Sequence, residues 1–276
     1  TAKKFGDQEG AEWWERQAGL LEQAREEWGP KCADVYLLTP GSGAALAGAA
    51  WLQEPVRRAL AEGSPKALRS VAREVCRDSR GHAVYAVDLF TDEFCEALMA
   101  ELDHLEASGI PLRRPNGMNR YGAILSFLGF QEGLLAPLMR LVIKPFAREL
   151  WPEWVAERDC DETYGFVVRY RLGEDVDLAE HADTSNVTLN ACLGRDFLGG
   201  ELHFKGVRFT ESADDQEEYV VANRKGVALL HLGGHFHLAR PVTSGDRSNL
   251  VLWGTGSGGV VRIRPNSPRR SGCELV

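Results

Sequence analysis

The hydrophobic period of this chain changes near residue 163, and that change limits the folds the chain can adopt. From there on, short segments alternate between apolar and polar residues, as strands with one buried face do. Gly and Asp residues typical of turns bound these segments, which are YGFVVRYRL (164–172), NVTLNACL (186–193), GGELHF (199–204), GVALLHL (226–232) and RSNLVLW (247–253). Several short strands in succession predict a β-sandwich or a jelly-roll barrel.

The first half of the chain has the period of helices instead. The segment EWWERQAGLLEQAREEWGP (12–30) is expected to be helical as far as its Gly-Pro pair. In TDEFCEALMAELDHLEASG (91–109), Thr91 is placed to act as the N-cap and Gly109 to end the helix. A third helical segment, 132–151, contains two prolines and should be kinked or split.

These patterns together predict an α+β fold with a jelly-roll core and supporting N-terminal helices. We expect an N-terminal helical extension over residues 1–80 and one main domain over residues 81–276. Within that domain the jelly-roll core should begin near residue 163.

Composition narrows the class of function. The formal net charge of −8 disfavours nucleic acid as a partner, because phosphate binding needs a clustered basic surface. No apolar run approaches the roughly 18 residues that span a bilayer, and no signal peptide is visible. We therefore expect a cytoplasmic or nuclear protein without membrane contact, although the chain begins at Thr1 and a removed targeting segment stays an alternative. Its six scattered cysteines form no CxxC pair, which favours reduced, buried thiols.

A candidate metal site begins in EHADTS, where His181 and Asp183 stand two positions apart. In an extended chain, residues i and i+2 lie on the same side, so both side chains can reach one metal ion. A histidine from a distant strand would complete two histidines and one carboxylate on one face of an octahedron. That is the facial triad of non-haem Fe(II) oxygenases.

The third ligand is expected in LHLGGHFHLARPVTSGDR (230–247), which holds three histidines. Alternation cannot distinguish His235 from His237, because these two share a face. The spacing favours His237: ten positions later, after a turn expected at Ser244-Gly245, Arg247 can return to the same cavity. A buried guanidinium beside a metal calls for a carboxylate that it can bind with two hydrogen bonds. 2-Oxoglutarate, an iron chelator with a second carboxylate, is the candidate ligand.

This combination resembles the signature of Fe(II)/2-oxoglutarate-dependent dioxygenases of the prolyl and lysyl hydroxylase type. FVVRY, HADTSNVTLN and FLGGELHF also resemble the catalytic domain of collagen lysyl hydroxylases. RPNGMNRYG, LNACLGRDFLGGELHF and HLARPVTSGDRSNLVLW are similar to the family called 2-oxoglutarate and iron-dependent oxygenase domain-containing protein 2. The resemblance covers residues 84–255 and implies a double-stranded β-helix, the jelly roll of this superfamily.

The resemblance also implies cofactors and the residues that bind them. Fe(II) is bound by the three catalytic residues His181, Asp183 and His237. 2-Oxoglutarate is bound by Arg247, and its pocket is lined by Tyr170 and Asn190, with Thr188 on the same strand face as Asn190. As a polar residue on an otherwise apolar strand, Asn190 is also expected on physical grounds to need a buried partner. Ascorbate is a further cofactor that the resemblance allows.

The loop LRRPNGMNRYG (112–122) has no hydrophobic period and could be an exposed connector. The family resemblance favours a position at the substrate entrance instead, with four residues facing the substrate: Arg113, Asn119, Arg120 and Tyr121. Among the remaining residues, His231 is expected to be a core histidine or a partner of a ligand. His235 is expected near the cavity mouth, and Trp253 is expected in core packing.

The sequence therefore predicts a dioxygenase that hydroxylates a C–H bond, with succinate and CO2 as co-products. The expected substrate is a lysine or proline side chain of a protein or peptide. One alternative is the same chemistry on a small metabolite or a nucleobase, and the acidity of the chain disfavours the nucleobase. Another is a non-catalytic jelly-roll binding module, which would be expected to have lost a key residue, although His181, Asp183, His237 and Arg247 are all present.

Overall fold

The computed structural model describes residues 49–108, 112–213, 217–262 and 270–271. The helix expected at 12–30 and the helix end at Gly109 lie outside the described residues. Within the described ranges, no helix is long and apolar enough to cross a membrane. Four cysteines in these ranges, Cys76, Cys95, Cys160 and Cys192, are free thiols, as predicted.

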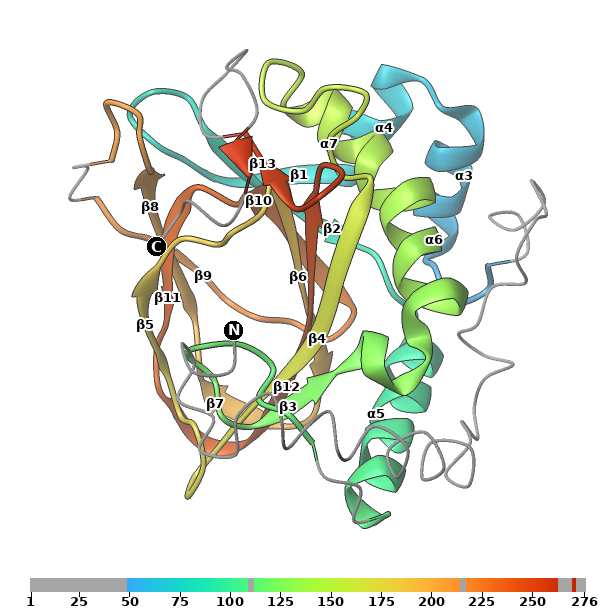
Figure 1. Ribbon diagram of the computed structural model, residues 1–276, viewed down its shortest axis with the longest axis vertical. Helices are drawn as coiled ribbons and strands as arrows, with labels where there is room; N and C mark the ends of the chain where they lie inside the picture. The colour runs from blue at the N-terminus through green and yellow to red at the C-terminus, as the bar shows by residue number, and fades with distance from the viewer. Residues whose placement is uncertain (1–48, 109–111, 214–216, 263–269, 272–276) are drawn as a thin grey trace.

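Two antiparallel sheets form the core of the fold. The large sheet has the strand order β1 (Ala72–Arg77), β2 (Ala83–Asp88), β10 (Val227–Leu232), β6 (Val187–Gly194), β12 (Val242–Thr255), β4 (Glu162–Arg171) and β3 (Gly122–Ile124), and β7 (Phe197–Gly199) also pairs with β12. The small sheet has the order β5 (Leu178–His181), β11 (His235–Ala239), β8 (Leu202–Val207) and β9 (Tyr219–Val221). The strands β13 (Val260–Val261) and β14 (Arg270–Ser271) pair with each other. Two facing sheets of this kind confirm the predicted jelly roll (Figure 1).

The helices lie together on one side of the large sheet, away from the small sheet (Figure 1). They are α3 (Glu54–Glu62), α4 (Pro65–Val71), α5 (Asp92–Ala107), α6 (Ala136–Leu138) and α7 (Lys144–Leu150), with a 3₁₀ turn at Leu125–Leu128 and π-helical turns at Gln131–Leu135 and Met139–Ile143. The expected split does not occur: the run from Gln131 to Leu150 is continuously helical and alternates between π-helical and α-helical turns, with right-handed helical dihedral angles at each junction. Pro137 and Pro145 each stand in the first turn of a short α-helix, where the missing N–H is tolerated. Buried apolar side chains fill the layer between these helices and the large sheet.

The N-terminus of α5 offers a test of local stability. The Thr91 hydroxyl oxygen accepts a hydrogen bond from the backbone N–H of Phe94 at 3.3 Å, as an N-cap does. We expect Thr91→Ala to lower the free energy of unfolding by about 1 kcal/mol, because one N–H of the first turn loses its partner. Urea denaturation followed by circular dichroism measures this change, and Thr91→Ser should restore the lost stability. An unchanged midpoint in Thr91→Ala would contradict a capping role.

The sheet begins earlier than the sequence pattern indicates. β1 lies within the residues expected to form a helical extension, and β1, β2 and β3 all precede residue 163. β1 is a half-exposed edge strand, and β2 is an almost continuously buried strand with no polar face. Neither therefore shows the alternation typical of a half-buried strand. The division of the chain into two domains stays a prediction.

The connection between His237 and Arg247 also differs from the expectation. The chain crosses from the small sheet to the large sheet at Arg240-Pro241, between β11 and β12, and not at residues 244–245. Gly245 lies inside β12 and pairs with β7 next to a register shift. Its φ is +77°, and a Cβ there would lie only 1.9 Å from the Asp196 carbonyl oxygen, so this position requires glycine. The predicted return of the chain into one cavity is nevertheless confirmed, because His237 of β11 and Arg247 of β12 line the same pocket.

Candidate metal centre and cosubstrate pocket

Three potential metal ligands meet between the two sheets. His181, the last residue of β5, lies directly opposite His237 of β11, and Asp183 follows two residues after β5. The Asp183 oxygen Oδ1 lies 3.5 Å from His181 Nε2 and 3.9 Å from His237 Nε2. One ligand atom from each residue lies within 4.8 Å of the others. These distances allow one metal ion to contact all three residues.

Both histidines are held in the tautomer that a metal requires. The Nδ1 of His181 lies 2.9 Å from the Ala179 carbonyl oxygen, and the Nδ1 of His237 lies 3.0 Å from the His235 carbonyl oxygen. Because each Nδ1–H donates to a backbone carbonyl oxygen, each Nε2 keeps a lone pair that can coordinate a metal ion. Burial lowers the pKa of His237 to about 4, so this imidazole is neutral at physiological pH.

The carboxylate of Asp183 is positioned by a hydroxyl group. Thr188 on β6 donates from Oγ1 to Asp183 Oδ2 at 2.7 Å, and this leaves Oδ1 facing the histidines. Burial alone would raise the pKa of the Asp183 carboxyl, but the surrounding histidines hold that pKa well below its usual range. The donor set is therefore two imidazoles and one carboxylate, which fits Fe(II) bound at a facial triad.

Arg247 of β12 is buried beside this centre, with 1% of its surface exposed. Its guanidinium carbon lies 4.3 Å from the centroid of the Tyr170 ring, and Nη1 donates to the Gly200 carbonyl oxygen. No carboxylate of the described residues forms an ion pair with Arg247, and its Nε has no hydrogen-bond partner there. Burial lowers the pKa of this guanidinium, which nevertheless stays charged. A buried cation without a counter-charge fits an anionic ligand.

A chain of asparagines connects the strand face of Asn190 to the arginine. Asn249 donates from Nδ2 to Asn190 Oδ1 at 2.6 Å and to Asn223 Oδ1 at 3.1 Å. Asn223 in turn donates to the Gly200 carbonyl oxygen at 2.7 Å, the same oxygen that accepts from Arg247. The predicted need of Asn190 for a buried partner is therefore met, and the hydrogen bonds fix the side of the pocket that surrounds the guanidinium.

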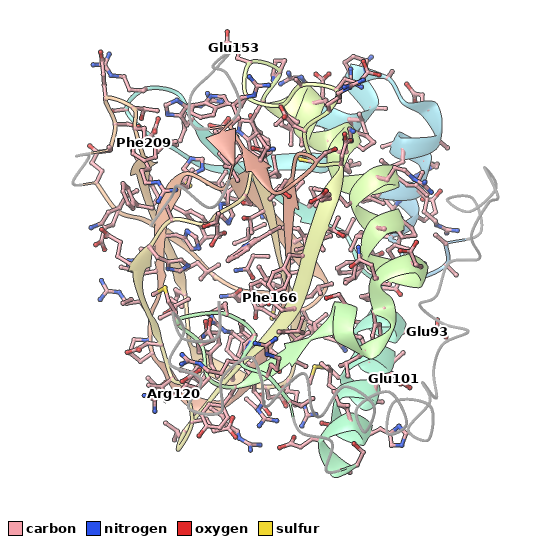
Figure 2. The ribbon with its side chains drawn as sticks, viewed as in Figure 1. Glu93, Glu101, Arg120, Glu153, Phe166 and Phe209 are labelled. Carbon is pink, nitrogen blue, oxygen red and sulfur yellow. The ribbon has the colours of Figure 1, made fainter. Side chains whose placement is uncertain are left out.

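One pocket joins the metal ligands to Arg247. Its lining includes His181, Asp183 and His237 at one end, and Tyr170, Asn190 and Arg247 at the other. Phe166 of β4 also lines this pocket and lies in the space between the two sheets (Figure 2). A larger cavity of about 490 Å³ opens beside His181 and Asp183 and is bordered by the loop residues Arg113, Arg114, Asn116, Gly117 and Met118. A small chelating acid therefore has a site next to a roomier cavity for a second molecule.

The structure separates the residues that were expected to bind cosubstrate or substrate. Tyr170, Asn190 and Arg247 line the inner pocket, whereas Thr188 contacts Asp183 and is not part of the pocket wall. Thr188 does share a strand face with Asn190, but it lies closer to the metal end. The structure therefore connects Thr188 to a metal-ligand candidate, and its contact with the cosubstrate stays a prediction.

The loop 112–122 is divided among three places. Arg113 borders the large cavity, as expected. Asn119 is buried and donates from Nδ2 to the Tyr170 hydroxyl at 3.1 Å, so it belongs to the inner pocket. Arg120 and Tyr121 line a different cavity beside α5, and their backbone N–H groups donate to Asp175. Figure 2 shows Arg120 at the lower edge of the molecule, away from Phe166. The structure therefore does not bring Arg120 and Tyr121 together with the metal-ligand candidates, and their contact with a substrate stays a prediction.

The other histidines are not part of the three-ligand cluster. His231 is fully buried, with Nε2 3.8 Å from Asp183 Oδ2, and burial lowers its pKa to about 3, so it is a neutral neighbour of a ligand as predicted. His235 is also buried and contacts His231, Phe204 and His82, so its expected place at the cavity mouth is wrong. A register shift between β11 and β8 falls between His235 and His237. Simple alternation therefore cannot place the two rings in one cavity.

Several residues that contribute to the site were not found by sequence reasoning. Trp253 packs against the buried cluster that contains Phe166, as expected, but it also lines both the inner pocket and the large cavity, which was not expected. Asn249 could have been found by the same signal as Asn190, because it is a polar residue inside the apolar run NLVLW. Gly200 has φ at +72°, and a Cβ there would lie 3.0 Å from Arg247 Nη1, but nothing in the sequence connects it to Arg247.

A jelly roll that places two histidines, a carboxylate and a buried arginine around one pocket has the architecture of the 2-oxoglutarate- and iron-dependent oxygenases. Residues 44–156 match the OGFOD2-like domain. The chain is 41% identical over 178 residues to the 2-oxoglutarate and iron-dependent oxygenase domain-containing protein ICU11 of Arabidopsis thaliana, covering 62% of this chain and 44% of that protein. It is 38% identical over 213 residues to the 2-oxoglutarate and iron-dependent oxygenase domain-containing protein 2 of Homo sapiens, covering 77% of this chain and 58% of that protein. The chain is therefore related to this family, as its motifs predicted.

More distant similarities agree with this relationship. The chain is 31% identical over 180 residues to the multifunctional procollagen lysine hydroxylase and glycosyltransferase LH3 of Homo sapiens, covering 61% of this chain and 23% of that protein. The crystal structure of SnoN, a non-haem α-ketoglutarate-dependent epimerase, superposes with a TM-score of 0.51 at 16% identity, covering 72% of this chain and 87% of SnoN. That similarity shows the fold. The chain spans about half the length of the first two relatives.

Proposed function

We propose that this chain is an Fe(II)- and 2-oxoglutarate-dependent dioxygenase that hydroxylates a C–H bond of a protein side chain. The observation that carries the proposal is the shared pocket, which has three metal-ligand candidates at one end and, at the other, a buried guanidinium that forms no ion pair with any described residue. A metal site alone would fit many functions. A metal site that adjoins a buried cation fits a cosubstrate that is both a chelator and a dianion.

The residues of the chain have separate roles in this proposal. His181, Asp183 and His237 hold the iron, and Thr188 keeps the carboxylate oriented. Arg247 binds the distal carboxylate of 2-oxoglutarate, with Tyr170 packed against the guanidinium and Asn119 bonded to the Tyr170 hydroxyl. When bound, the iron would activate O2. One oxygen atom then becomes the hydroxyl group at the substrate C–H bond, and the other becomes part of succinate as 2-oxoglutarate loses CO2.

A protein substrate is supported by two observations. The cavity beside the metal ligands is large, about 490 Å³, and its border includes the loop 113–118. The relative LH3 is named for its action on procollagen lysine. A small metabolite would be the substrate if peptides gain no oxygen and a metabolite pool does.

The test is iron-dependent decarboxylation of 2-oxoglutarate. Purified protein is stripped of metal with a chelator, reloaded with Fe(II) under anaerobic conditions, and supplied with 2-oxoglutarate and O2, with and without ascorbate. We expect succinate to form only after iron is added, and we expect calorimetry to detect stoichiometric Fe(II) binding. A chain that neither binds Fe(II) nor forms succinate is the result expected of the non-catalytic binding module.

A further inference from the structure

The large cavity beside the metal ligands has a mainly apolar wall. Tyr164, Trp253, Ile124, Leu178 and Met118 all border it. The rings of Tyr164 and Trp253 lie 5.9 Å apart at 43°, and the Trp253 ring packs edge-to-face on Phe166 at 5.2 Å. These contacts hold the two aromatic side chains in place, so the wall exists before a substrate enters.

The polar ends of the two aromatic residues differ. The Tyr164 hydroxyl donates to the Pro115 carbonyl oxygen at 2.8 Å, and this bond ties the loop to β4. Because that hydroxyl is already bonded, the tyrosine offers an incoming group chiefly apolar contact. The indole Nε1 of Trp253 is buried and has no hydrogen-bond partner among the described residues, so this ring also offers an incoming group chiefly apolar contact.

The charges around the cavity are unsuited to a cation. Among the described residues that line it, the only arginines are Arg113 and Arg114, and the only carboxylate is Asp183. Asp183 already accepts a hydrogen bond from Thr188 and lies against two histidines. Arg114 donates to the carbonyl oxygens of Gly117 and Asn119, which fixes it within the loop. Among the described residues that line this cavity, an ammonium group would therefore meet two guanidinium groups and no carboxylate other than that of the metal-ligand candidate Asp183.

We propose that this cavity takes an uncharged, apolar side chain of a peptide substrate, of the size of a prolyl residue, and excludes the ammonium group of lysine. The inference rests on the proposed function and decides between the two side chains that the sequence left open. A neutral ring loses little solvation on entering an aromatic wall and gains contact with Tyr164 and Trp253. A lysine would lose the hydration of its ammonium group without gaining a counter-charge.

The test compares three peptide libraries that share randomised flanks and differ only at a fixed central residue: proline, norleucine or lysine. Norleucine has the four-carbon side chain of lysine with a hydrogen atom in place of the ammonium group, so their comparison tests the effect of the charged group. The protein is loaded with Fe(II) and 2-oxoglutarate without oxygen, and retained peptides are quantified by mass spectrometry. We expect about tenfold stronger retention of the proline and norleucine libraries than of the lysine library. Admission of oxygen should then add one oxygen atom to peptides of the proline library.

A charge-reversed variant tests the origin of the preference. Arg113→Glu is expected to raise retention of the lysine library by about tenfold, because it adds a carboxylate at the cavity border. Arg58→Glu, on the exposed surface of α3, is the matched control and should keep the wild-type preference. Equal or stronger retention of lysine by the wild type overturns the inference, as does an unchanged preference in Arg113→Glu. If these outcomes occur while iron-dependent succinate formation persists, the proposed function stands without this inference.

Discussion

Replacing Arg247 with methionine is expected to weaken 2-oxoglutarate binding by about 10–150-fold, since one hydrogen bond to a charged group contributes roughly 1.5–3 kcal/mol. The guanidinium is buried and lacks a carboxylate partner among the described residues, so the cosubstrate would be its counter-ion. Metal binding should stay unchanged, because Arg247 is not part of the ligand cluster. Calorimetric titration of 2-oxoglutarate into the Mn(II)-loaded protein, without oxygen, measures the cosubstrate affinity, and titration of Mn(II) into the metal-free protein measures metal binding.

Two further measurements make this prediction specific. Arg247→Lys keeps the charge but loses the planar pair of donors, so its affinity should lie between those of the wild type and Arg247→Met. The free energy of unfolding of the ligand-free Arg247→Met protein should not fall, because the substitution removes a buried charge that has no counter-charge. Wild-type affinity for 2-oxoglutarate in Arg247→Met would show that the distal carboxylate binds elsewhere.

The link between His237 and Arg247 could be predicted from sequence because both ends of the segment face the same space. β11 belongs to the small sheet and β12 to the large one, so ten residues bring the chain from one wall of the pocket to the other. The ten-residue spacing between His237 and Arg247 reflects that crossing. The inference drawn from the spacing does not depend on the expected turn, because residues 244–245 lie in a strand next to a register shift. His181 and Asp183 followed from alternation in an extended segment, which does not depend on the rest of the fold.

The loop 112–122 could not be resolved in the same way. Its neighbouring residues Asn119 and Arg120 lead into different cavities, and no period in the sequence predicts this division. The direction of each residue is set by partners far along the chain: Tyr170 accepts from the Asn119 side chain, and Asp175 accepts from the Arg120 backbone. The hydrogen bond from Thr188 to Asp183 could not be predicted for a related reason. Alternation identifies the face of a strand, but the position along that face decides which end of the pocket a side chain reaches.

Substitutions around the candidate metal centre are expected to weaken Fe(II) binding in a graded order. His237→Ala removes a ligand atom and should have the largest effect. Thr188→Val keeps the shape of the side chain but removes the hydroxyl that donates to Asp183 Oδ2, and loss of such an outer partner lowers metal affinity by about 10–100-fold. His203→Ala is the control, because His203 is paired with Glu218 and does not belong to the ligand cluster. Anaerobic calorimetric titration of Fe(II) measures the affinity of each variant.

Thr188→Ser distinguishes support of the metal from ordinary packing. Serine restores the hydroxyl but lacks the methyl group, so it should recover most of the Fe(II) affinity that Thr188→Val loses. If Thr188 acts only through packing, the opposite pattern is expected: Thr188→Val would bind Fe(II) like the wild type, and Thr188→Ser would be the less stable protein. The free energy of unfolding of each ligand-free variant, measured by urea denaturation, separates the two interpretations. The order His237→Ala, Thr188→Val, Thr188→Ser, from weakest to strongest Fe(II) binding, therefore tests both the ligand set and the hydrogen bond that orients it.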